Sequence, residues 1–164
     1  LVAAQDISVF VRNDGTTRRL RLEVSNEGGS TSGSVTYRLE VSGPDPGSCS
    51  AATYTRVDTS THWDMASSAE FADGASTVNY APGLTDENTG FVNGELKDSN
   101  DQTGGITLTS AQFTEIEFAL TPGTSATAGA TYCFRLTNAG TTTDFTYASY
   151  AQATVVDRRV IIIE

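Results

Sequence analysis

The sequence predicts an all-β protein: a single antiparallel β-sandwich of about eight to ten strands, with a long loop-rich insert and an extended terminal strand. Three observations support this fold class. Apolar and polar residues alternate with period two along much of the chain, helical periodicity is almost absent, and Gly- and Pro-containing polar segments separate the alternating stretches. With 164 residues, the chain can bury the core of one domain.

Six segments carry the strand pattern: residues 6–14, 17–26, 34–43, 112–121, 131–138 and 145–156. In the first segment, Ile7, Val9 and Val11 share one face. In the fourth, the apolar residues are expected to face the core, whereas Glu115 and Glu117 are expected to be solvated on the outer face. Each strand therefore has one face suited to a sandwich core.

Turn signals separate these strands. Residues 26–34 (NEGGSTSGS) are expected to form a flexible hairpin connection, and residues 43–50 and 137–143 are expected to form turns. The alternation slips near residues 149–152, which predicts a β-bulge.

The pattern weakens between residues 58 and 105, which we interpret as a loop-rich insert with short strands around 69–71 and 91–96. Loops of this length in a compact domain are usually functional or take part in contacts. We expect residues 1–157 to form the sandwich domain and residues 158–164 to form a separate apolar strand or arm.

Two cysteines, Cys49 and Cys133, allow one disulfide. In a chain rich in Thr, Ser and Gly and poor in Lys, an extracellular disulfide is favoured over two buried thiols. Cys133 lies on the strand face opposite Phe134 and Leu136, so a bond to Cys49 would hold a loop against the outside of that strand.

The charge of the chain limits its partners. A net charge of −10 argues against nucleic-acid binding, which needs clustered Lys and Arg. No segment approaches the roughly 20 apolar residues of a membrane-spanning helix. The chain does not start with Met, and we expect a processed end after signal-peptide removal and an extracellular or cell-surface location.

Several stretches, NEGGSTSGSVTYRLE, HWDMASSAEFADG, GLTDENTGFVNGELKDSNDQTGGITL, QFTEIEFAL and GATYCFRLTNAGTTTDFTYASYAQATV, support a family resemblance. They resemble an immunoglobulin-like β-sandwich repeat module of large cell-surface proteins predicted from uncultured bacteria. The resemblance covers residues 16–156, and TYCFRLTNAGT followed by FTY is its most specific part. It implies a secreted surface context and no reaction. The chain departs from that family as a single module with the added tail DRRVIIIE.

Catalytic and zinc sites find little support. A Ser-His-Asp arrangement would have to use His62, the single histidine, and Asp64 is its nearest acidic neighbour, without a GxSxG elbow. We interpret His62 and Trp63 as a loop packing or contact pair, and we expect no enzymatic activity. Zinc would need more His and Cys ligands than the chain supplies.

A calcium site is one interpretation of the acidic turn at Asp98, Asn100 and Asp101, since calcium takes six to eight oxygen ligands. The turn lacks EF-hand spacing, and a solvated acidic turn is the default interpretation. Trp63, Tyr80 and Phe91 are expected to be exposed aromatic residues of the insert, which could stack on sugar rings or contact another protein.

The tail VVDRRVIIIE contains four consecutive β-branched residues, Val160, Ile161, Ile162 and Ile163. A strand with apolar side chains on both faces must be covered on both sides. The segment is either a central strand of its own sandwich or a strand that completes the sheet of a neighbouring copy. In the second case, Arg158 and Arg159 would form a hinge and charge clamp against an acidic partner, and Ile7, Val9 and Val11 would provide a second apolar strand for the contact.

We therefore expect a structural subunit of an extracellular filament, pilus or similar surface assembly, a homopolymer formed by β-strand exchange between copies. The alternative is a monomeric carbohydrate-binding or adhesive module that uses the insert at 58–105, with His62, Trp63 and Phe91 in its contact loop. No cofactor is expected beyond the calcium ion considered above.

Overall fold

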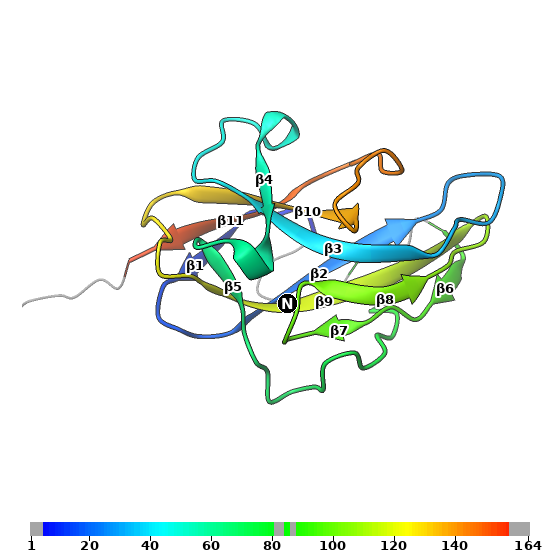
Figure 1. The fold of residues 1–164 in the computed structure, drawn as a ribbon, viewed down its shortest axis with the longest axis horizontal. Coiled ribbons are helices and arrows are strands. Elements are labelled where there is room, and N and C mark those ends of the chain that lie inside the picture. Colours follow the sequence, from blue (N-terminus) through cyan, green and yellow to red (C-terminus); the bar gives the residue numbers. More distant parts are fainter. Residues whose placement is uncertain (1–4, 81–83, 86–87, 158–164) are drawn as a thin grey trace, which may run out of the picture.

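Two β-sheets packed face to face form the protein, whose computed structural model describes residues 5–80, 84–85 and 88–157 (Figure 1). Sheet A contains β1 (Val9–Arg12), β11 (Ala151–Val156), β10 (Thr131–Asn138), β3 (Val35–Ser42), β4 (Tyr54–Arg56) and β8 (Gln102–Ile106). Sheet B contains β2 (Arg18–Ser25), β9 (Gln112–Pro122), β5 (Trp63–Met65), β6 (Gly90–Val92) and β7 (Leu96–Lys97). Two short 3₁₀ helices, η1 (Cys49–Ala51) and η2 (Val57–Thr59), flank β4. The predicted all-β sandwich is confirmed.

Most strand pairs are antiparallel, but three pairs are parallel. In sheet A, β1 runs parallel to β11, and Val9 lies opposite Ala153. In sheet B, the short strands β6 and β7 run parallel to β9. The predicted antiparallel sandwich thus includes three parallel pairs, because long connections bring these strands back in the same direction as their partners.

The core lies between the two sheets and is centred on β9, the longest strand. Its inward residues Ile116, Phe118 and Leu120 are at most 2% exposed. They pack in one cluster with residues of β3, β10 and β11, as the alternation predicted. β11 begins at residue 151, within the segment where the alternation slips.

The connection at residues 26–34 is not a hairpin, because β2 lies in sheet B and β3 lies in sheet A. The chain crosses between the sheets at this point, and Ser32 donates its main-chain N–H to the carbonyl of Leu108. Hydrophobic alternation shows which face of a strand is buried but not which sheet the strand joins, so the sequence could not distinguish the two connections.

The insert adds strands to both sheets. Its segments β5, β6 and β7 extend sheet B along β9, and β8 pairs with β3 in sheet A. The strand expected near 91–96 corresponds to β6 and β7, whereas the strand expected at 69–71 is wrong, because those residues form turns and bends.

The expected solvation of Glu115 and Glu117 is also wrong. Glu115 is 0% exposed and Glu117 is 5% exposed, although both point away from the core between the sheets. The insert covers them: Thr77 donates its hydroxyl to the main-chain carbonyl of Glu115, and the N–H of Tyr80 lies 3.2 Å from both carboxylate oxygens of Glu115. Arg21 of β2 lies beside both carboxylates and pairs with them. Sheet B thus carries an ionic layer under a loop on its outer side.

The predicted disulfide between Cys49 and Cys133 is confirmed, with the two Cα atoms 5.6 Å apart. It ties η1 to β10 on the side away from the core, and its half-cystine Cys133 is buried. Within the described part of the chain, no helix is both long and apolar enough to traverse a bilayer.

Replacing both cysteines by alanine (Cys49→Ala with Cys133→Ala) should lower the free energy of unfolding. The bond joins residues 84 positions apart. A cross-link of that span restricts the unfolded chain by about 4 kcal/mol on the chain-entropy model. Urea denaturation of the variant beside the oxidised wild type measures the difference. A loss below about 1 kcal/mol would contradict the prediction.

Gly94 is expected to tolerate no side chain. It is buried between β6 and β7 and donates its N–H to the hydroxyl of Thr77, and a Cβ placed there would overlap the main-chain carbonyl of Glu115. Gly94→Ala should therefore destabilise the fold by about 1–3 kcal/mol, as overpacked interiors do. Gly33→Ala is the matched control, because Gly33 is exposed and a Cβ there meets nothing within 4 Å. Equal stability of the two variants in thermal denaturation would refute this.

Candidate functional site

A groove opens between the two sheets along β2. Its volume is about 690 Å³. One wall is formed by residues 22–25 of β2, and the opposite wall is formed by residues 134–136 of β10 with the segment 144–149 that precedes β11. We call this feature the β2 groove.

Apolar side chains of the core line the β2 groove. Leu22 and Val24 contribute from sheet B, while Leu136 and Phe145 contribute from the opposite wall. Leu22 and Val24 are only partly buried, unlike the inward residues of the neighbouring strand β9, which are almost completely buried. The sandwich core is therefore incompletely covered at this position.

The strand β2 is the edge of sheet B. Among the residues described, it pairs along its whole length with β9 and with no other strand. Just beyond β2, Asn26 accepts a hydrogen bond from the N–H of Ala111 and donates its own N–H to Gln112. Because main-chain groups alternate in direction along a strand, those of Arg21 and Ser25 point away from β9. Such an edge presents hydrogen-bonding groups to an added strand.

Carboxylates surround the β2 groove. Asp6, Glu23, Glu27 and Asp144 all line it. Its two arginines, Arg21 and Arg135, are paired with glutamates outside the groove. Within the described ranges, no ion pair involves Asp6, Glu27 or Asp144, and the rim is thus acidic.

Two hydrogen bonds connect the N-terminal segment to the mouth of the β2 groove. The N–H of Thr85 donates to Gln5 Oε1 over 2.7 Å, and the hydroxyl of Ser149 donates to Asp6 Oδ1 over 2.7 Å. At one end of the opening, these bonds join the N-terminal segment to the insert and to the segment before β11.

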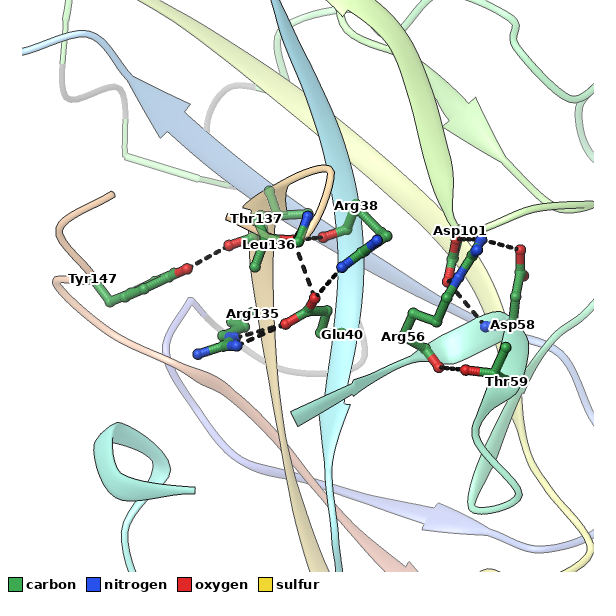
Figure 2. Close-up of polar contacts among 11 residues, drawn as sticks. Arg38, Glu40, Arg56, Asp58, Thr59, Asp101, Arg135, Leu136, Thr137 and Tyr147 are labelled. Carbon is green, nitrogen blue, oxygen red and sulfur yellow. Dashed lines mark hydrogen bonds and ion pairs between the residues drawn. The ribbon is translucent and has the colours of Figure 1, made fainter. Parts of the chain in front are cut away.

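A stacked row of aromatic rings supports the wall of the β2 groove that lies opposite β2. Phe145 stacks on Tyr147 with ring centroids 6.0 Å apart, and Tyr147 stacks on Tyr150 at 5.1 Å. The hydroxyl of Tyr147 donates to the carbonyl of Leu136 over 2.6 Å, as Figure 2 shows. Burial raises the pKa of Tyr147 above its ordinary value. The segment before β11 is thereby fixed to β10.

A buried carboxylate joins β3 to β10 beside this row. Glu40 is 5% exposed and accepts hydrogen bonds from Arg135 at 2.8 and 3.0 Å and from Arg38 at 2.7 Å (Figure 2). The guanidinium of Arg135 also lies 4.0 Å above the ring of Tyr54, a cation–π contact. Burial of Glu40 is thus matched by two charged partners.

A second ionic cluster joins β4 and η2 to the segment before β8. Arg56 donates to both carboxylate oxygens of Asp101, and the N–H of Asp58 donates to Asp101 Oδ2 (Figure 2). The hydrogen bond with Asp101 raises the pKa of Arg56. Burial, followed by the charge of Asp101, raises the pKa of Asp58. The cluster holds the insert against sheet A.

The predicted calcium ligands are each held by a different protein partner. Asp101 is bound by Arg56, Asp98 accepts the N–H of Ser68, and Asn100 donates to Asp73. Burial alone would raise the pKa of Asp73, but hydrogen bonds from the main chain of Asp98 and from neighbouring residues lower it. In the portion of the chain that the structure describes, no group of three or more His, Cys, Asp or Glu residues is arranged to hold a metal ion.

The predicted contact loop is largely built into the core. Trp63 is 2% exposed and packs edge-to-face on Phe134, so the prediction of an exposed tryptophan is wrong. Phe91 is half-buried against Phe113. The partly exposed imidazole of His62 hydrogen-bonds through Nδ1 to the carbonyl of Ser125. Trp63 lies at a position of strand β5 that faces the core, which the weak pattern of the insert did not indicate.

The predicted subunit contacts divide into two groups. Arg158, Arg159, Val160, Ile161, Ile162 and Ile163 lie outside the described residues. In the N-terminal segment, Val11 is buried in the core and Val9 packs against it, whereas Ile7 is 61% exposed and Phe10 is 75% exposed. The apolar face of β1 thus belongs mainly to its own domain.

Comparisons with protein-family models, with curated protein sequences and with solved structures found no match to this chain.

Sequence reasoning did not identify the β2 groove. The alternation at residues 17–26 places Leu22 and Val24 on one face of a strand, and nothing in their spacing indicates that they are partly exposed. Phe145 and Tyr147 were included in a predicted strand, whereas they lie in the segment before β11. The cluster of Gly, Asn and Thr at residues 137–143 is the available sequence signal of an irregular segment that extends beyond the turn.

Alkaline pH should destabilise the fold through buried tyrosines. Burial raises the pKa of Tyr37 to about 12. Because the unfolded phenol titrates near ~10, its contribution to stability is complete below pH ~10 and is lost as the pH rises toward 12. In urea denaturation at a series of pH values, the wild type should lose stability across this window, and Tyr37→Phe should lose less. Tyr80→Phe is the control, since Tyr80 is 44% exposed. Parallel profiles for wild type and Tyr37→Phe would contradict the prediction.

Proposed function

We propose that this chain is a structural subunit of an extracellular filament, pilus or similar surface assembly, and that its copies join by β-strand exchange. The observation that carries the proposal is the open edge of sheet B at β2. There, an edge strand and partly exposed core side chains lie together in one groove. A strand added at that position would form main-chain hydrogen bonds and cover apolar side chains at the same time.

The sequence supplies a segment with the properties of such a strand. Residues 160–163 are β-branched and apolar on both faces, so they are suited to a site that is covered on both sides. Burial of four such side chains contributes roughly 6–12 kcal/mol before the loss of conformational and translational entropy is subtracted. This is enough to hold subunits together in a polymer.

An extracellular location is supported by the disulfide between Cys49 and Cys133. Disulfides form and persist in oxidising compartments and are rare in the cytosol. A structural role in a surface assembly also agrees with the way charged residues are used: the buried carboxylates of Glu40, Asp101 and Glu115 hold strands and loops together through arginines.

Removing residues 158–164 should abolish self-association. The full chain is expected to form filaments or concentration-dependent oligomers in negative-stain electron microscopy and sedimentation velocity, whereas a chain ending at Asp157 should remain monomeric. Circular dichroism and an intact-mass test for the disulfide verify that both forms are folded. Compact monomers from both forms at all concentrations would reject the proposed function.

A further inference from the structure

We infer that the β2 groove is the acceptor site of this assembly and that its occupant is residues 157–164 of a second copy of the chain, running antiparallel to β2. The inference rests on the proposed function and specifies the surface and direction of the contact. Three features of the molecule lead to it: the two-sided apolar surroundings of β2, the position of the acidic rim, and the distance between the end of β11 and that rim.

Apolar surfaces lie on both sides of the β2 edge. On the inner side, Leu22 and Val24 face the β2 groove. On the outer side, the guanidinium of Arg21 lies over the ring of Tyr80 and donates to the carbonyl of Val78. Val78 is 66% exposed and Tyr80 is 44% exposed. An added strand would place alternate side chains against these two surfaces, which explains why an occupant needs apolar residues in both rows.

The rows of residues 157–164 meet this requirement. Val160 and Ile162 form one row, and Ile161 and Ile163 form the other. The segment contains no proline, so the N–H of each alternate residue that faces β2 is available to donate to its main chain.

Charge determines the direction of the added strand. Glu27 follows the C-terminal end of β2, whereas Arg19 lies near the N-terminal end. A strand that runs antiparallel to β2 starts beside the C-terminal end, which places Arg158 and Arg159 next to Glu27. A parallel strand would instead place them toward Arg18 and Arg19, where the nearby carboxylates of Asp14 and Glu117 are already ion-paired. Opposite charges across a contact fix its register and exclude the reversed arrangement.

Asp144 lies at the same end of the β2 groove as Glu27. It precedes Phe145, whose ring packs on Tyr37 at 6.2 Å between centroids. Tyr37 pairs with Asn138, the last residue of β10. Glu27 and Asp144 therefore lie where β10 ends and the 26–34 connection begins.

The occupant must come from another copy because the chain's own arginines cannot reach this end. β11 starts at Ala151, opposite Phe134 in the groove, and runs past Thr131, away from Asn138. Its six residues from Ala151 to Val156 span roughly 17 Å. Arg158 and Arg159 follow Val156 by two and three positions, so their Cα atoms lie at most about 10 Å from that of Val156. They can meet Glu27 and Asp144 of a neighbouring copy only.

A charge-exchange experiment on the full chain tests the contact. Variant one carries Glu27→Arg and Asp144→Arg, and variant two carries Arg158→Glu and Arg159→Glu. Each variant alone places like charges at the contact, so assembly followed by sedimentation velocity should require at least roughly tenfold more protein than the wild type. In an equimolar mixture, each groove meets a tail of opposite charge, and assembly should return.

The control variant carries Asp64→Arg and Glu70→Arg, two exposed positions outside the groove, and should assemble like the wild type. Glu27 and Asp144 are also exposed, so variant one is expected to fold, which circular dichroism verifies.

Three results would overturn the inference. If both variants assemble normally while the chain ending at Asp157 does not, strand exchange stands and the β2 groove is not its acceptor; residues 1–4 or another molecule would then be the candidates for the groove. If each variant alone fails to assemble and the equimolar mixture also fails to assemble, the antiparallel charge pairing is wrong. If the wild-type chain never assembles, the proposed function fails together with the inference.

Discussion

Burial of β9 on both faces is the constraint on which the structure depends. Its inner row packs into the core, and its outer row places Glu115 and Glu117 where Arg21 pairs with them beneath the insert. Two carboxylates removed from water are tolerated because a charged partner and main-chain donors replace the solvent. The loop-rich insert therefore has a structural role, since it supplies β5, β6 and β7 and the cover over this ionic layer.

The same arrangement leaves the neighbouring strand β2 incompletely covered. The neighbours of β9 protect it along its length, whereas β2 is paired on one side within the described residues. The partly exposed Leu22 and Val24 then form a groove with the wall around Phe145, which Tyr147 ties to β10. Pre-organisation of an acceptor reduces the ordering entropy that an added strand must overcome. This asymmetry between β2 and β9 is the physical basis of the proposed assembly.

Buried arginine–carboxylate groups recur where distant segments meet. Glu40 connects β3 to β10, and Asp101 connects the insert to β4 through Arg56. These groups restrict where polar segments can pack, because a misplaced segment would leave a charge buried without its partner. Acidic residues at such positions stabilise the packing of distant segments. In the sequence, the turn at Asp98, Asn100 and Asp101 resembles a calcium site, but its polar groups are bound by protein partners.

The sequence by itself determined the fold class, the six principal strands and the inward rows such as Ile116, Phe118 and Leu120, because period-two alternation is a local signal. It also determined the pairing of Cys49 with Cys133, because the chain contains only these two cysteines. Only the tertiary structure decided which sheet each strand joins, the burial of Trp63 and Glu115, and the opening beside β2. These features depend on which distant segment covers a given face. The outer row of a strand is polar both when it faces water and when it pairs with an arginine beneath a loop. Hydrophobic alternation therefore does not indicate whether another segment covers that row.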